Sequence, residues 1–162
     1  MMPINPFSAK EVEASFGGRY VLGAELRVGG QGAVYRAKRV RRPDGSACND
    51  EVALKLHLDA KQDKRVEREI EAMQHLRHPA LATLLEEGTI SISGKQTRYI
   101  AWEFIHGEPL DLRLSRGAVT EKEAIRIARD VTSAIVALWG KHIVHRDIAP
   151  KNIMISPMEA RS

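Results

Sequence analysis

The chain has 162 residues, of which 43% are hydrophobic, 28% charged and 5% aromatic. This apolar fraction excludes an intrinsically disordered chain, and the length suits one domain or slightly more. The net charge of +4, from 25 basic and 21 acidic residues, would favour a polyanionic partner without identifying one.

Short β-favouring runs occupy most of the first two thirds of the chain. Residues 1–18 are expected to form an irregular lead-in that ends at Gly17-Gly18. The runs that follow, rich in Val, Ile, Leu and Tyr, predict five strands. These predicted strands are residues 20–26, 33–40, 51–58, 84–92 and 98–104. Pro43-Asp44-Gly45 and Ser93-Gly94-Lys95 predict hairpin-type turns between neighbouring strands.

Two predicted helices interrupt this pattern. In the first, apolar residues recur from Val66 to Leu76 at helical spacing, and Pro79 ends the helix. The second, residues 121–139, begins with a capping box formed by Thr120 and Glu123, and Gly140 suits its C-terminal end. Its last two turns are apolar nearly all round, which predicts cover on more than one side. Since only 22 residues follow Gly140, we expect a missing segment or a partner to cover this helix.

Several features indicate the kind of partner and compartment. The basic run Lys38 to Arg42 has no interleaved aromatic residues, so we interpret it as the solvated end of a strand and expect no nucleic-acid partner. A single cysteine, Cys48, cannot form an internal disulfide and points to a reducing compartment. The longest uncharged stretch in the C-terminal half, Val131 to Gly140, is far shorter than the roughly 20 residues of a membrane-spanning helix. We therefore expect a soluble, cytoplasmic protein.

The most informative segment is His145 to Asn152, which reads His-Arg-Asp-Ile-Ala-Pro-Lys-Asn. It resembles the catalytic loop of protein kinases. By that resemblance Asp147 accepts the proton of the substrate hydroxyl, and Asn152 binds Mg²⁺. Lys151, four residues after Asp147, lies where tyrosine kinases carry an arginine, so the resemblance implies that its charge neutralises the transferred phosphoryl group. Taken alone, Asp147 and Asn152 could equally belong to an ordinary polar loop after a helix.

Three further segments resemble kinase motifs in the same order along the chain. Val52-Ala53-Leu54-Lys55 resembles the strand whose lysine binds the α- and β-phosphates, and Glu69 stands where kinases place the glutamate that pairs with that lysine. Gly29, Gly32 and Val34 fit the glycine-rich loop that approaches the triphosphate, with Arg27 in place of the first glycine.

The segment Trp102 to Gly107 resembles the hinge between the two kinase lobes. The resemblance implies that the backbones of Glu103 and Ile105 meet the adenine edge and that Trp102 lies behind it. Glu108 or Asp111 could then reach the ribose. A core aromatic on a strand remains a compatible interpretation of Trp102.

Together these motifs, from about Tyr20 to Ile155, identify the chain as a eukaryotic-like protein kinase, similar to the bacterial serine/threonine type. The resemblance implies an α+β fold. Residues 19–104 would form the N-lobe, a five-stranded antiparallel sheet with one helix, and 105–162 the hinge and the first helices and catalytic loop of a mostly helical C-lobe. ATP and Mg²⁺ are the implied cofactors, and an unidentified protein the implied substrate.

One motif of the family is missing from these residues. The Asp-Phe-Gly motif, whose Asp binds Mg²⁺, is expected about 18 residues after Asp147, and the 162 residues do not contain it. We therefore interpret the chain as a truncated kinase domain that is weakly active or inactive alone. The alternative is a pseudokinase-like module that binds nucleotide or a partner without catalysis.

Overall fold

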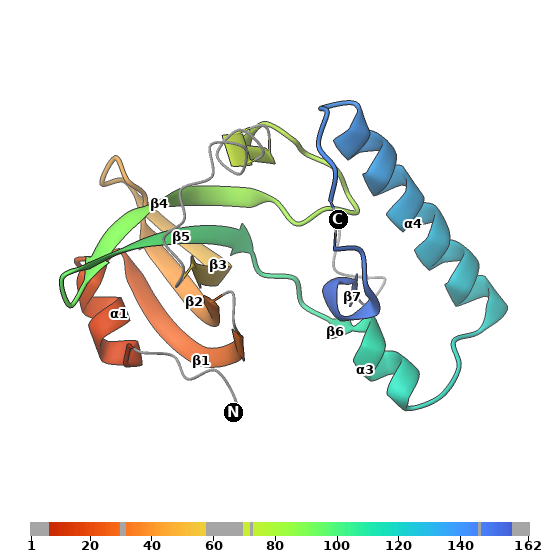
Figure 1. The fold of residues 1–162 in the computed structure, drawn as a ribbon, viewed down its shortest axis with the longest axis horizontal. Coiled ribbons are helices and arrows are strands. Elements are labelled where there is room, and N and C mark those ends of the chain that lie inside the picture. Colours follow the sequence, from red (N-terminus) through yellow and green to blue (C-terminus); the bar gives the residue numbers. More distant parts are fainter. Residues whose placement is uncertain (1–6, 30–31, 58–69, 72, 146, 157–162) are drawn as a thin grey trace. The chain divides into compact units, whose positions relative to one another are not determined.

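The computed structural model describes residues 7–29, 32–57, 70–71, 73–145 and 147–156 (Figure 1). The chain divides into two compact units. The first unit comprises Met1–Ile70 and Thr83–Phe104, and the second unit comprises Glu71–Ala82 and Ile105–Ser162. The segment expected to form the N-lobe, residues 19–104, therefore includes a stretch, Glu71–Ala82, that groups with the second unit.

The first unit is built on a five-stranded antiparallel sheet in the order β1-β2-β3-β5-β4 (Figure 1). The strands are β1 (Tyr20–Gly29), β2 (Gly32–Arg41), β3 (Ala47–His57), β4 (Leu84–Ile92) and β5 (Lys95–Glu103). All five predicted strands are confirmed; β4 has the predicted bounds, and the other four are longer than their apolar runs. Both predicted turns are also present. Gly45 has φ +83°, and Ser93 and Gly94 have φ +50° and +81°, the left-handed values that tight hairpin turns require.

Burial alternates along the central strand, as expected for a sheet with one face in a core. Val52, Leu54 and Leu56 of β3 are fully buried, whereas Ala53 and Lys55 between them are half-buried. The apolar core therefore lies on the face opposite to Ala53 and Lys55.

A short helix, α1 (Ala9–Ser15), contributes to that core and contacts both edge strands, β1 and β4. Val12 and Phe16 are almost completely buried, and the Phe16 ring lies edge-on to Tyr99 with centroids 4.9 Å apart. The irregular lead-in expected for residues 1–18 is thus wrong at this point. A seven-residue helix is too short to display an apolar period, but Ser8 and Glu11 form a capping box that begins it.

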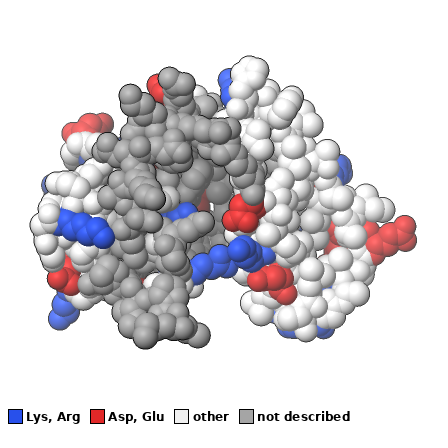
Figure 2. All heavy atoms as spheres, viewed as in Figure 1, with Lys and Arg blue, Asp and Glu red and all other residues white. Residues whose placement is uncertain are grey.

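Lys38, Arg41 and Arg42 of the basic run are exposed, whereas Arg39 is buried. Arg39 is 5% exposed and binds carboxylates inside the first unit, while Arg42 donates to Ser46 within the turn after β2. On the face shown in Figure 2, the described Lys and Arg side chains form small separate groups. The interpretation of residues 38–42 as a strand end agrees with this arrangement.

The second unit is mainly helical in its described residues. Its elements are β6 (Glu108–Pro109), α3 (Leu110–Ser115), α4 (Glu121–Trp139), the 3₁₀ helix η1 (Pro150–Asn152) and β7 (Met154–Ile155). Helix α4 has the predicted bounds and the predicted capping box of Thr120 and Glu123. Gly140 ends it in a right-handed conformation, and the left-handed residue is His142, with φ +58°.

The other predicted helix lies partly outside the described residues, which exclude 66–69 and 72. Ile70, Glu71, Met73 and Gln74 are helical, and the helical conformation ends before Pro79. Along α4, several large apolar side chains are exposed, with Trp139 at 69% and Val136 at 66%. Within the described ranges, no helix has the length and apolar character needed to cross a membrane.

Candidate functional site

The register of the sheet places the candidate nucleotide-binding residues of the first unit on one face. Val34 of β2 lies opposite Lys55 of β3, and Ala53 lies opposite Arg36 on one side and Trp102 on the other. Residues directly opposite each other in a sheet share a face. Val34, Ala53 and Lys55 therefore share the face away from the apolar core, and Arg36 and Trp102 join them there.

The glycine-rich turn between β1 and β2 depends on one backbone approach. Gly29 pairs with Gly32, and Gly32 has φ +147°. A Cβ atom at Gly32 would collide with the backbone carbonyl oxygen of Leu56, so only glycine fits there. Arg27, which replaces the first glycine of the motif, is exposed and lies opposite Val34. The two residues at the tip of the turn, 30 and 31, are outside the described residues.

The charge of Lys55 acts on a titratable neighbour of the same strand, His57. His57, two residues further along β3, has its pKa lowered to about 4 by burial, and the charges of Lys55 and Arg98 contribute further. A neutral imidazole at this position adds no charge near Lys55. Glu69, the predicted partner of Lys55, lies outside the described residues.

The predicted hinge begins where β5 ends. The backbone N–H of Glu103 donates to the Thr83 carbonyl at 2.8 Å, and the N–H of Phe104 donates to the Glu51 carbonyl at 3.0 Å. The guanidinium of Arg36 lies over the Phe104 ring, 4.7 Å from its centroid. These contacts hold the end of β5 to β4 on one side and to β3 on the other.

The predicted catalytic loop belongs to the second unit and is held by its own hydrogen bonds. Asn152 Nδ2 donates to the backbone carbonyl of Asp147 at 2.9 Å, and the N–H of Asp147 donates to the carbonyl of His145 at 2.8 Å. The side chains of Asp147, Lys151 and Asn152 are exposed. The structure therefore brings together the three residues predicted for catalysis, with both backbone polar groups of Asp147 engaged.

A pair of two-residue strands holds the C-terminal end of this loop. Strands β6 and β7 pair through Glu108 with Ile155, and the N–H of Leu110 donates to the Ile153 carbonyl at 2.8 Å. A Cβ atom at Gly107 would collide with the Ile155 carbonyl oxygen. In the sequence, Gly107 is only the last residue of the hinge motif. The close approach of Ile155 explains why a residue without a side chain is needed there.

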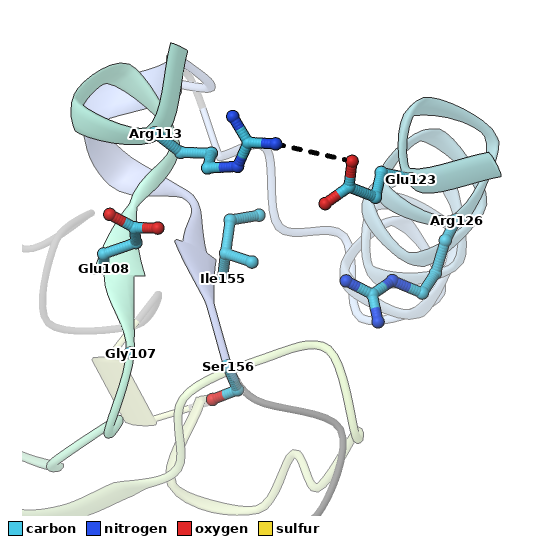
Figure 3. A pocket seen from close by; sticks show the side chains of 7 residues that line it. All are labelled: Gly107, Glu108, Arg113, Glu123, Arg126, Ile155 and Ser156. Atoms are coloured by element: carbon cyan, nitrogen blue, oxygen red, sulfur yellow. Dashed lines mark ion pairs between the residues drawn. The ribbon is translucent and has the colours of Figure 1, made fainter. Parts of the chain in front are cut away.

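Glu108, predicted to reach the ribose, makes an ion pair with Arg116 at 2.6 Å. It also lines a pocket of about 460 Å³ within the second unit, together with residues from α3, α4 and β7 (Figure 3). Across this pocket Arg113 of α3 points toward Glu123 of α4, with 3.5 Å between their charged atoms. Asp111 lies in the first turn of α3, where its carboxylate accepts from the N–H of Leu112.

The residues present fit a magnesium ion only in part. Because Asn152 Nδ2 is bound to Asp147, Oδ1 is the atom of this side chain that remains to ligate a cation, and oxygen is the ligand that Mg²⁺ prefers. Within the described ranges, no group of three or more His, Cys, Asp or Glu side chains is arranged as a metal site. Asn152 is the predicted Mg²⁺ ligand of this loop, and its Oδ1 is the atom that would bind the ion.

Comparison with known proteins agrees with the motifs. The model of the protein kinase domain matches residues 20–161. The serine/threonine-protein kinase PksC of Streptomyces coelicolor is 32% identical over 151 residues, which cover 86% of this chain and 26% of PksC. The serine/threonine-protein kinase PknB of Mycobacterium tuberculosis is 32% identical over 148 residues, which cover 88% of this chain and 23% of PknB.

A plant protein is similar to the same degree. The putative CBL-interacting protein kinase 13 of rice is 30% identical over 143 residues, which cover 85% of this chain and 26% of that protein. The chain thus spans about a quarter of the length of these curated relatives. It belongs to the protein kinase family, of the eukaryotic-like type that bacterial serine/threonine kinases share. Helix α1 precedes the matched residues.

Proposed function

We propose that this chain carries the nucleotide-binding sheet and catalytic loop of an ATP-dependent serine/threonine protein kinase. Residues 19–104 would act as the N-lobe and residues 105–162 as the hinge and first part of the C-lobe. The observation that carries the proposal is the hydrogen bond from Asn152 Nδ2 to the Asp147 carbonyl. It ties the candidate base to the candidate metal ligand within one loop, and phosphoryl transfer requires such groups to be positioned together.

Each candidate residue has a definite task in this proposal. The side chain of Lys55 binds the α- and β-phosphates, while Val34 and Ala53 contact the base from the same sheet face. The backbones of Glu103 and Ile105 meet the adenine edge. Asp147 orients the hydroxyl of a protein serine or threonine and accepts its proton, and Lys151 neutralises negative charge on the transferred phosphoryl group. Gly29 and Gly32 allow the backbone to approach the triphosphate, and Glu69 orients Lys55.

Magnesium, when bound, supplies positive charge that neutralises the phosphate oxygens during transfer. Asn152 would be its ligand from this chain. We expect these 162 residues alone to transfer phosphate slowly, since the Asp of an Asp-Phe-Gly motif is not among them. A loss of about 3–4 kcal/mol in transition-state stabilisation corresponds to a decrease of roughly a hundred- to a thousandfold in rate.

The second candidate function, a pseudokinase-like module that binds nucleotide or a partner, is favoured by the apolar surface of α4. Ile125, Val136 and Trp139 are each more than 60% exposed, and a patch of such side chains is typical of an interface. Either the remainder of a C-lobe or a separate partner would cover this helix. The exposed surface of α4 is therefore compatible with both candidate functions.

Thermal unfolding of the chain with and without Mg²⁺-ATP tests the proposal. At a nucleotide concentration a hundred times Kd, we expect stabilisation of about 2.7 kcal/mol, or an increase of roughly 5–10 °C in Tm. Lys55→Met should abolish the shift, because it removes the phosphate-binding cation. Lys10→Met is the matched control, since Lys10 is an exposed lysine of α1 that precedes the kinase match.

Transfer is tested separately with γ-labelled ATP and a protein acceptor. Any rate that Asp147→Asn abolishes, even one lowered about a thousandfold by the missing Asp-Phe-Gly aspartate, would support the kinase. Nucleotide binding with no transfer above the Asp147→Asn background would support the pseudokinase-like module. A Tm that does not respond to Mg²⁺-ATP would contradict nucleotide binding. It would overturn the kinase proposal and leave only the module that binds a partner.

A further inference from the structure

Arg36 lies on the candidate nucleotide face but belongs to none of the kinase motifs in the sequence. It is on β2, opposite Ala53 of β3 and two residues after Val34. Its side chain is 46% exposed, so burial in a core does not account for a large charged residue at this position. Its contacts indicate another role.

Two groups hold the Arg36 guanidinium in place. Its Nη2 and Nε atoms donate to the same oxygen of Glu51, at 2.5 and 3.0 Å. Its plane also lies over the ring of Phe104, with 4.7 Å from Cζ to the ring centroid. A guanidinium at this distance from an aromatic centroid is attracted by the negative face of the ring.

Glu51 acts on Phe104 through its backbone as well as through Arg36. Its carbonyl oxygen accepts the N–H of Phe104 at 3.0 Å, while its carboxylate orients the guanidinium that covers the ring. Phe104 is thus held at its backbone by β3 and at its side chain by β2. It directly follows Glu103, the last residue of β5, and precedes Ile105.

We propose that Arg36 is a positioning residue for adenine recognition. By holding Phe104, it fixes the peptide groups on either side of that residue, the ones through which Glu103 and Ile105 would meet the adenine edge. This inference rests on the proposed nucleotide site. It predicts that Arg36 affects recognition of the base and not only the affinity for the triphosphate.

The test compares ATP with GTP, which share the triphosphate and differ in the base edge. Each nucleotide, with Mg²⁺, displaces a fluorescent N-methylanthraniloyl-ATP from the full chain. In Arg36→Met we expect the affinity for ATP to fall about three- to tenfold, with a smaller change for GTP, so the selectivity for ATP decreases. Arg36→Lys keeps the charge but not the planar guanidinium, and should restore little of the selectivity.

Lys38→Met is the matched control. It removes the same charge from the same face of β2, opposite Glu51, so it measures the general electrostatic effect on a nucleotide anion. We expect it to lower the affinities for ATP and GTP by the same factor. Phe104→Leu should reproduce the loss of selectivity, and the double variant Arg36→Met/Phe104→Leu should add little to either single change.

The outcomes separate the inference from the proposed function. If the unmodified chain binds neither nucleotide, the proposed function fails and the role of Arg36 with it. If the unmodified chain binds ATP selectively and Arg36→Met retains that selectivity, the inference alone is overturned. Equal losses for ATP and GTP in Arg36→Met, as in Lys38→Met, would also overturn it, because they would indicate charge and not positioning.

Discussion

Arg39 of β2 and Glu86 of β4 form an ion pair at 3.1 Å, although β3 and β5 lie between their strands in the sheet. Their side chains are 6% and 4% exposed. The same carboxylate accepts hydrogen bonds from Tyr99, at 2.6 Å, and from Arg19, while Arg39 also binds Asp50 at 2.7 Å. A contact between β2 and β4 requires the sheet to curl, and this buried network links residues in or next to all five strands.

The first prediction concerns this network. Glu86→Gln removes one of the two carboxylates that bind the buried guanidinium of Arg39. It also removes the carboxylate that binds Arg19. Removing one partner of a buried pair is strongly destabilising, so we expect the free energy of unfolding to fall by about 3 kcal/mol. Urea denaturation measures this change. Glu87→Gln, which breaks the more exposed pair with Arg98, should cost about 1 kcal/mol or less; equal losses would contradict the prediction.

The second prediction concerns α1, which precedes the residues matched by the kinase model. Phe16 is 3% exposed and packs against the rings of Tyr20 and Tyr99. Phe16→Ala should therefore lower the free energy of unfolding by about 3–5 kcal/mol, as in other aromatic core residues. The measurement is again urea denaturation. Lys10→Ala on the same helix should have little effect, and an unchanged stability in Phe16→Ala would mean that α1 is not part of the folded first unit.

The third prediction contrasts two glycines. In Gly32→Ala the new methyl group would collide with the Leu56 carbonyl oxygen of the neighbouring strand, so β2 and β3 must separate locally. Gly45→Ala meets no atom within 4 Å and carries only the strain of φ +83°, about 1–2 kcal/mol. We expect Gly32→Ala to be the more destabilising and to weaken Mg²⁺-ATP binding, as measured by Tm with and without nucleotide. Gly45→Ala should leave nucleotide binding unchanged, and a reversed order would contradict the structure of the turn.

The fourth prediction concerns pH. Burial lowers the pKa of His57 from its ordinary value of 6.5 to about 4. Between these pH values the unfolded chain binds a proton at His57 and the folded chain does not. Stability therefore falls as pH decreases from 6.5 toward 4. Urea midpoints at pH 7 and pH 5 measure the effect. The hydrogen bond from Arg39 lowers the pKa of Asp50 from 3.8. Carboxylates of this kind therefore lose their contribution to stability only below the pH range in which His57 acts.

Two variants attribute this pH dependence. His57→Phe should remove the decrease between pH 7 and pH 5, since the variant has no proton to take up at this position. His142→Asn is the control, because His142 is exposed and asparagine tolerates its left-handed backbone. A decrease that persists in His57→Phe would show that another group is responsible.

Local patterns predicted much of the fold. The alternating runs located all five strands, and the capping box of Thr120 and Glu123 located α4 to the residue. Helix α1 was not predicted because seven residues are too few to display an apolar period. The pairing of β6 with β7 joins residues 108 and 155 through two-residue strands, and such short strands leave no alternation to detect.

The candidate site was predictable only as far as motifs reach. The motifs named Lys55, Asp147 and Asn152, and the hydrogen bond within the catalytic loop agrees with their spacing. Two further features depend on tertiary structure. Arg36 contacts Phe104, and Glu51 binds both of them, through residues from separate strands. Glu108 binds Arg116 across the length of α3, which no kinase motif describes.

The chain contains two tryptophans, and each unit has one of them. Trp102 is half-buried on β5 of the first unit, whereas Trp139, at the end of α4 in the second unit, is 69% exposed. Their fluorescence should differ, with emission from Trp102 at shorter wavelength than emission from solvent-exposed Trp139. Replacing either one with Phe leaves a single emitter in a known unit. Denaturation followed through each variant would then show whether the sheet and the helical unit lose their structure in one transition or in two.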